Sequence, residues 1–308
     1  MNKKTLPILA LISCFLWASA FPVLKITYEL LNMNSNDIYS KVQLAGYRFL
    51  LAAIIIFVIY MIIYKKLPKF SLKDFKLYLL LGLFQTTLQY FFFYNGLANT
   101  SGVKAAVLSS SGTFFVVILA HIVYTDDKIT FNKIIGLLSG FIGIIVINMD
   151  NIGSTSDFFN ISLMGEGFLI CAGLVSAIGT ILAKNIMKGR NPFIVTGGQM
   201  LMGSIILLIV GLIGNGGQVI EFNSKAFSLY VYSAFLSAIA FCIWYYLLRK
   251  FKATEVTIYK FLIPILGAIL SVLFIREETF NKYIIVGLLF ASGGIYIVNK
   301  INSNYKNN

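Results

Sequence analysis

Charged residues are scarce in this chain of 308 residues. They make up 12% of it, and it has a single histidine and three cysteines. Hydrophobic residues make up 58%, a larger share than soluble domains of this length normally carry. We therefore expect the chain to fold in lipid.

Motifs of catalysis and of nucleotide hydrolysis are absent. The sequence has no G-x-S-x-G, no H-E-x-x-H and no P-loop. Cys14, Cys171 and Cys242 lie in apolar segments without a nearby histidine, so no metal site is expected. We expect no enzyme activity and no cofactor. Any transport would be driven by an ion gradient, by exchange or by the substrate's own gradient.

The basic excess has a membrane explanation. The 25 lysines and arginines outnumber the 12 acidic residues, but they occur in short runs between apolar stretches. A nucleic-acid-binding protein would gather them on one face. The partner that this pattern favours is the lipid bilayer, with no nucleic acid.

Ten apolar segments are close to the roughly 20 residues needed to cross a bilayer. They predict an all-α membrane protein with ten transmembrane helices. The segments are 6–27, 43–64, 75–97, 103–124, 133–149, 163–184, 193–213, 227–248, 253–275 and 283–299.

The distribution of positive charge predicts the orientation. If the amino terminus is cytoplasmic, 17 lysines and arginines lie on the cytoplasmic side, six lie outside, and Arg48 and Lys260 lie within spans. Cytoplasmic loops of membrane proteins are enriched in such residues. Both termini are therefore expected in the cytoplasm.

An internal repeat divides the chain into two halves, 1–149 and 150–308. At an offset of 151 residues, Gly136 matches Gly287, Gly143 matches Gly294, and Asn148 matches Asn299; the first helix fits its partner at an offset of 159. Five spans in each half make the second half start on the opposite side of the membrane. The sequence thus predicts two inverted five-helix repeats, as in carriers that work by alternating access.

Three motifs in this order resemble the drug/metabolite transporter superfamily, and within it the EamA-like ten-helix permeases. Trp17–Pro22 resembles the W-x-S-x-F-P signature of the first helix, and Tyr47–Ala52 resembles the R-F-L-L-A start of the second. Ala253–Pro264, followed by Glu278 and the helix that contains Gly287, resembles the pattern of the ninth and tenth helices. The resemblance covers nearly the whole chain.

The resemblance implies a carrier of the bacterial inner membrane. It places a central cavity among helices 1, 3, 4, 6, 8 and 9, with helices 5 and 10 peripheral. This sequence departs from the family pattern at Thr113, Asp127 and Ser176, where Pro, Glu and Trp are usual or expected. The first half of the cavity is therefore expected to have an atypical shape.

Lys260 is the leading candidate for substrate binding. It lies seven residues inside the ninth span, and a charge at such depth costs at least about 2.5–3.5 kcal/mol. Pro264 cannot donate to the carbonyl of Lys260, so we expect a helix broken beside the charge. The ammonium is expected to face the cavity and attract a carboxylate or phosphate. Snorkelling, or a pair with Glu255, is the alternative.

Other polar and aromatic residues at membrane depth complete the candidate site. The repeat places Ser109, the first of three serines, at the position that corresponds to Lys260. Gln85 and Gln89 are four residues apart and share a helix face. Packing is the simpler explanation for each group. The full set of candidates is Lys260, Ser109, Ser110, Ser111, Gln85, Gln89, Tyr90, Trp244, Tyr259 and Trp17.

Three further residues are interpreted as structural or gating elements. Pro22 and Pro264 are expected to kink their helices, either as fixed architecture or as flexing points. Arg48 is expected near the outer end of its helix, where it would snorkel or pair with Glu166.

The leading functional hypothesis is a secondary transporter for a small polar metabolite, such as an amino acid or a similar anionic or zwitterionic compound. The alternatives are an exchanger of nucleotide-like or phosphorylated metabolites, a lipid-carrier flippase, a membrane enzyme and a receptor. The sequence leaves open the substrate, the direction of transport, a coupling ion, and whether the protein is a monomer or a homodimer.

Overall fold

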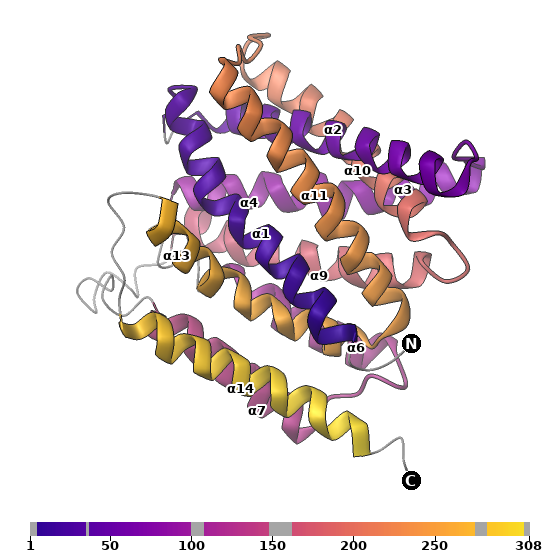
Figure 1. Cartoon of the computed structure of the whole chain (residues 1–308), viewed down its shortest axis with the longest axis vertical. Helices are drawn as coiled ribbons and strands as arrows, with labels where there is room; N and C mark the ends of the chain where they lie inside the picture. Colours follow the sequence, from indigo (N-terminus) through magenta and orange to yellow (C-terminus); the bar gives the residue numbers. More distant parts are fainter. Residues whose placement is uncertain (1–4, 35–36, 100–107, 148–161, 275–281, 305–308) are drawn as a thin grey trace.

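A computed structural model describes residues 5–34, 37–99, 108–147, 162–274 and 282–304. Every regular element in these ranges is a helix (Figure 1), which confirms the all-α prediction. The elements of the first half are α1 (Thr5–Leu30), α2 (Ile38–Tyr64), α3 (Leu72–Gly82), η1 (Leu83–Leu88), α4 (Gln89–Ala98), α6 (Ser111–Val123) and α7 (Phe131–Ile147). Those of the second are η3 (Leu163–Gly167), α9 (Phe168–Ile186), α10 (Pro192–Gly214), α11 (Ser224–Lys250), α12 (Ala253–Thr257), η4 (Ile258–Phe261), α13 (Leu262–Phe274) and α14 (Lys282–Asn304).

Seven helical segments within the described ranges are long and apolar enough to cross a membrane. They are Thr5–Leu30, Ile38–Tyr64, Leu163–Ile186, Pro192–Gly214, Ser224–Lys250, Ala253–Phe274 and Lys282–Asn299. Ser111–Val123 and Phe131–Ile147 are shorter apolar helices, and α3, η1 and α4 form one continuous run. The protein is thus a multi-pass membrane protein, while the number of ten spans stays a prediction. Glu278 and the start of the predicted span 103–124 lie outside the described residues.

Polar caps outside the apolar runs set where several helices begin. Ser71 and Asp74 form a reciprocal capping box at the start of α3. The side chains of Ser162, Asn191 and Asn223 accept backbone N–H groups at the starts of η3, α10 and α11. As a result, α11 begins at Ser224, three residues before the predicted span.

Three elements depart from regular α-helix. Residues Leu83–Leu88 and Leu163–Gly167 are π-helical, and Ile258–Phe261 is a 3-10 segment between α12 and α13. The 3-10 segment contains Lys260, where the sequence predicts a broken helix. The π-helical turns were not predicted, because hydrophobic periodicity assumes 3.6 residues per turn. Such turns are frequent at functional sites.

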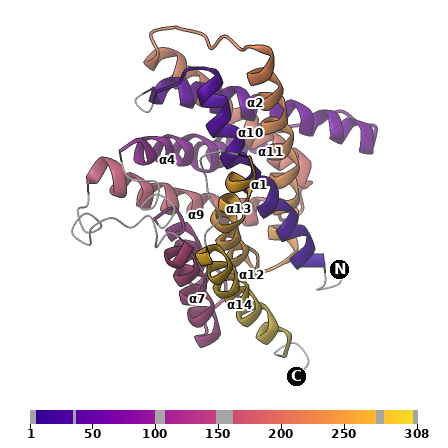
Figure 2. The same cartoon turned by 60° about the vertical axis from the view of Figure 1, so that its left-hand side comes forward.

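Helices from the two halves pack against one another throughout the bundle (Figures 1 and 2). α2 packs on α10, and α7 packs on α14 as a pair at one edge. α1 contacts α11 and α13, whereas α9 contacts α4 and α6. α2 also contacts α11, and α3 contacts α10. The core of the protein therefore lies between the halves.

The pairs α7–α14 and α2–α10 are antiparallel. A Cβ atom added at Gly143 would lie 2.7 Å from the carbonyl oxygen of Gly287, and one added at Gly136 would lie 2.7 Å from that of Gly294. Along the other pair, a Cβ at Gly211 would meet the backbone of Gln43, whereas one at Gly197 would meet Phe57. In both pairs, the contacts with higher residue numbers on one helix involve lower residue numbers on the other, so the two helices run in opposite directions. Small residues permit such close backbone approach in membranes.

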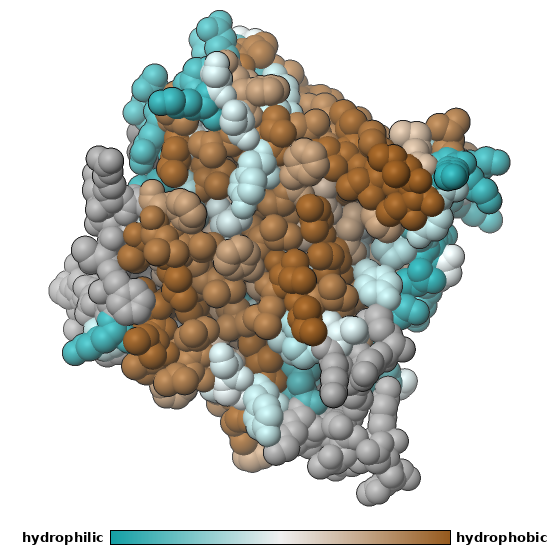
Figure 3. All heavy atoms as spheres, viewed as in Figure 1, coloured by the Kyte–Doolittle hydropathy of each residue, from teal (hydrophilic) through white to brown (hydrophobic). Residues whose placement is uncertain are grey.

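The outer surface is suited to lipid. Figure 3 shows one face that is mostly hydrophobic, with hydrophilic residues gathered toward its margins. Many large apolar side chains point outward, among them Ile62, Phe131, Ile213 and Leu289, which are each exposed by more than 60%. In water this surface would promote aggregation, so its natural surroundings are acyl chains.

Candidate functional site

Lys260 lies in the 3-10 segment η4, which begins where α12 ends. Its ammonium nitrogen is 5.5 Å from the ring centroid of Trp244 in α11, a cation–π distance. It is not paired with Glu255, whose carboxylate accepts the backbone N–H of Lys252. Within the described part of the chain, the ammonium has no carboxylate partner. The alternative of a pair with Glu255 is therefore wrong.

The backbone of η4 is tied to the first helix. The thiol of Cys14 in α1 lies 3.3 Å from the carbonyl oxygen of Tyr259, to which it donates a hydrogen bond. Tyr259 is itself 4% exposed. Pro264 follows in α13, where it leaves the carbonyl of Lys260 without its usual donor. The helix thus tightens to a 3-10 turn beside Lys260 and then continues as α13, so it is irregular there but not interrupted; α1 continues through Pro22.

A line of aromatic rings connects Lys260 to Tyr90. Trp17 makes edge contacts at 5.0 Å with both Trp244 and Phe241. Phe241 lies 6.3 Å from Phe49, and Phe49 lies 4.7 Å from Tyr90. The structure therefore joins four of the sequence candidates, which are Lys260, Trp244, Trp17 and Tyr90, through two rings that the sequence interpretation did not include.

The indole of Trp17 and the amide of Gln85 have unused hydrogen-bonding atoms. Nε1 of Trp17 is buried without an acceptor among the described residues, and Oε1 of Gln85 is buried without a donor. The amide of Gln85 donates to Oε1 of Gln89 at 2.7 Å, so the two glutamines do share a face. A buried polar atom without a partner calls for an explanation, and a hydrogen bond to a polar ligand would be one.

The last of the three serines lies beside α9. Ser109 and Ser110 precede α6, and Ser111 is its first residue. Oγ of Ser111 is buried and sits against Gly173 of α9. The contact between α6 and η4 instead runs through Phe114, whose ring centroid is 6.1 Å from that of Phe261. The repeat relation between Ser109 and Lys260 is therefore not accompanied by a described side-chain contact.

Arg48 is placed differently from the sequence interpretation. Its side chain is 3% exposed, so it does not snorkel. Its Nε donates to the carbonyl of Ser233 at 3.1 Å and to Oγ of Ser237 at 2.7 Å, both in α11. Glu166, the expected partner, instead accepts the backbone N–H of Ser162. Ser233 and Ser237 are four residues apart, and that spacing is the feature that could have indicated a polar face opposite Arg48.

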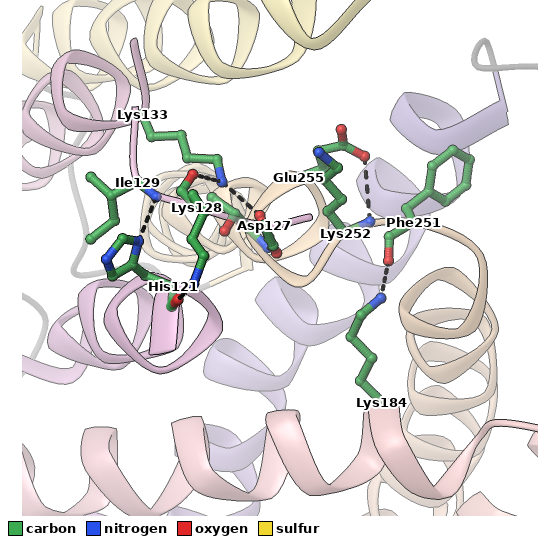
Figure 4. A network of polar contacts seen from close by, with 10 residues as sticks. His121, Asp127, Lys128, Ile129, Lys133, Lys184, Phe251, Lys252 and Glu255 are labelled. Carbon is green, nitrogen blue, oxygen red and sulfur yellow. Dashed lines mark hydrogen bonds and ion pairs between the residues drawn. The ribbon is translucent and has the colours of Figure 1, made fainter. Parts of the chain in front are cut away.

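A second polar network ties together the helix ends on the side of the α6–α7 connection (Figure 4). Asp127, 1% exposed, forms an ion pair at 2.6 Å with Lys133 and accepts the backbone N–H of Thr254 at the start of α12. Lys133 also donates to the carbonyl of Lys128. Lys184 donates to the carbonyl oxygens of Leu248 and Phe251. These contacts join α7 to α12, and α9 to the end of α11.

A cleft of about 470 Å³ lies between the start of α3 and the start of α10. Its lining includes Lys69, Lys188 and Arg190, and none of the candidate substrate residues. Arg190 donates to Asp74 at 3.0 Å. Hydrogen bonds from Ser71 and Arg190 hold the pKa of the Asp74 carboxyl below its ordinary value. This solvated ion pair fastens the α9–α10 connection to α3.

Comparisons with known proteins agree with these observations. The model of a family described as the EamA-like transporter family matches residues 5–149 and 163–300. An uncharacterized transporter of Archaeoglobus fulgidus is 25% identical over 299 residues, which cover 96% of this chain and 98% of that protein. The uncharacterized transporter YvbV of Bacillus subtilis is 27% identical over 262 residues, 83% of this chain and 81% of its own. A solved crystal structure with 11% identity covers 99% of both chains at a TM-score of 0.77, a likeness of fold alone.

Proposed function

Because this chain belongs to the EamA-like transporter family, and is thus a membrane transporter, we propose that it is a secondary transporter for a small polar metabolite. Its substrate would be an amino acid or a similar anionic or zwitterionic compound. It would work by alternating access in the plasma membrane of a bacterium. The observation that carries the proposal is the ammonium of Lys260, which has no carboxylate partner among the described residues and is held in a 3-10 turn beside Trp244.

The central site has the features that a carrier requires. Irregular backbone at membrane depth is tolerated where it lines a site, and η4 provides it. The ammonium of Lys260 and two indole rings come together there from both halves, on η4, α1 and α11, and the line of rings continues to Tyr90 on α4. In this proposal Lys260 binds the carboxylate, Trp17, Trp244 and Tyr90 contact the organic part, and Gln85 and Gln89 bind polar groups. Tyr259 supports the backbone, and Ser109–Ser111 line the opposite wall.

Antiparallel packing supports the inverted repeat. In the proposal, α7 corresponds to α14, and α2 corresponds to α10, with Phe131 and Lys282 at the starts of α7 and α14 exactly one repeat offset of 151 residues apart. Corresponding helices that run antiparallel are expected if one half is upside down relative to the other. The glycine contacts agree, since the pair Gly143–Gly287 becomes Gly294–Gly136 when the halves are exchanged.

The pattern of helix contacts supports the same two-fold relation. Exchanging the halves turns the contact of α1 with α11 into the contact of α9 with α4, and the contact of α1 with α13 into that of α9 with α6. It also turns the contact of α2 with α11 into that of α10 with α3. The start of α1 and the end of α14 lie at the same end of the bundle (Figure 1), as ten spans with both termini in the cytoplasm require.

Replacing Lys260 with alanine is expected to weaken substrate affinity about 10- to 100-fold, the factor for a lost charge-assisted hydrogen bond. The measurement is uptake of radiolabelled amino acids, organic acids and phosphate esters into proteoliposomes. Lys260→Arg should retain part of the activity, because it keeps the charge.

Lys76→Ala is the matched control, since Lys76 is an exposed lysine of α3. It should transport as the unchanged protein does. Unaltered affinity in Lys260→Ala would remove Lys260 from the site, and preference for phosphate esters over amino acids would favour the phosphorylated-metabolite exchanger.

A further inference from the structure

Arg48 lies far inside α2. It is ten residues from the start of that helix, which corresponds to roughly 15 Å at 1.5 Å per residue. The side chain is 3% exposed, so it does not reach the water or the lipid head groups that would solvate its charge. An ionisable residue at such depth indicates function unless a partner explains it. A functional role for Arg48 therefore depends on whether the protein itself supplies partners for all of its guanidinium nitrogens.

The protein satisfies only one edge of the guanidinium. Nε donates to Ser233 and Ser237, and this fixes the orientation of the planar group. Among the residues that the structure describes, none accepts a hydrogen bond from the two terminal nitrogens of Arg48. A guanidinium held by Nε presents its terminal N–H groups as a rigid fork, which matches the oxygens of a carboxylate or a phosphate.

One aromatic ring lies against the guanidinium, and further rings continue from it. The guanidinium carbon is 5.4 Å from the ring centroid of Phe49, which contacts Tyr90. Tyr94 follows at 5.9 Å from Tyr90 and is 5% exposed. Phe49 also contacts Phe241, through which the ring line continues to Trp244 and Lys260. Arg48 and Lys260 thus lie at the two ends of one connected aromatic group.

Within the described ranges, no carboxylate is paired with either of these two cations. Every acidic residue in the described ranges lies in the first or last turn of a helix or in a connection. The buried ones are engaged elsewhere, with Asp127 on Lys133 and Glu166 on Ser162. The site therefore holds positive charge for an anion to neutralise. Its described residues offer no carboxylate as counter-ion to the ammonium group of a zwitterion.

We infer that Arg48 binds an anionic group of the transported compound, and that this compound carries a net negative charge. The inference rests on the proposed transport function and narrows its substrate class to organic acids or phosphate esters. Lys260 and Arg48, from the two halves of the chain, supply the two positive positions for that anion.

The test compares compounds of similar size and different charge. Proteoliposomes with the full chain are given labelled lactate and succinate as anions, glycerol 3-phosphate as a phosphate ester, and alanine and serine as zwitterions. Transport of one or more of the anions, with little of the zwitterions, is expected. For the transported anion, Arg48→Gln should weaken affinity about 10- to 100-fold and Arg48→Lys should weaken it less.

Ser237→Ala separates binding from a structural role. It removes one acceptor of Nε but leaves the terminal N–H groups. Its main effect should therefore be a lower melting temperature of the ligand-free protein, with a smaller effect on affinity for the anion. The main effect of Arg48→Gln should be weaker affinity, and its melting temperature without ligand shows whether it folds. If Arg48→Gln does not fold, Arg48→Lys with reduced affinity and a normal melting temperature carries the same conclusion.

Transport of zwitterions alone would overturn the charge inference and leave the proposed function standing. Unchanged affinity for the anion in folded Arg48→Gln would also overturn it. Transport of no compound of any charge would contradict the proposed function, and the inference with it.

Discussion

Replacing Asp127 with alanine is expected to destabilise the folded protein by about 3–5 kcal/mol, the usual cost of leaving one partner of a buried ion pair uncompensated. The carboxylate forms a 2.6 Å ion pair with Lys133 and also accepts the N–H of Thr254, so Lys133 loses its counter-ion and Thr254 loses its acceptor. Denaturation in mixed micelles measures the change.

Asp126→Asn is the matched control, because Asp126 is the exposed neighbour of Asp127. Its effect should stay within about 0.5 kcal/mol. Removing the second charge should recover stability, so Asp127→Asn with Lys133→Met should be more stable than Asp127→Asn alone. A loss of less than about 1 kcal/mol in Asp127→Ala would show that water reaches this pair and that it does not fasten α7 to α12.

Alanine at Gly294 is expected to cost about 2–3 kcal/mol, toward the upper end for overpacking. Its Cβ would lie 2.4 Å from the carbonyl oxygen of Gly136, and a backbone atom cannot move aside as a flexible side chain can. The helices α7 and α14 must then separate. The melting temperature of the purified protein measures the loss.

Gly293 provides the control on the same helix. No atom lies within 4 Å of a Cβ added there, so Gly293→Ala should be neutral or slightly stabilising through its better helix propensity. If both variants have the same stability, the two helices do not approach as closely as the structure shows, and the antiparallel contact that supports the repeat is lost.

The sequence predicted the helices more successfully than their contacts. Apolar length alone indicates where helices lie, because lipid leaves few other ways to satisfy the backbone. The matched glycines of 136–149 and 287–299 were found as a repeat, yet their reciprocal contact across α7 and α14 needed coordinates. Helix starts were displaced because caps such as Asn223 lie outside the apolar runs.

The candidate site was predicted in part. Proline chemistry anticipated irregular backbone at Lys260, since Pro264 removes a specific donor, but the structure has a 3-10 turn there and not a break. Arg48 was misjudged, because its acceptors on α11 are more than 180 residues away in the chain. Phe49 and Phe241 were missed for a similar reason. In a single sequence, nothing separates a phenylalanine of this ring line from one that only fills the core. The role of these two rings follows from the rings that they contact.

Labelling of single cysteines from each side of the membrane tests alternating access most directly. In a variant without the three native cysteines, Lys260→Cys should react with a membrane-impermeant thiol reagent from either side. Lys69→Cys should react only from the cytoplasm, and Lys225→Cys only from outside. Reaction of Lys260→Cys from one side alone, or of Lys69→Cys and Lys225→Cys from the same side, would contradict an inverted repeat around a centrally placed site.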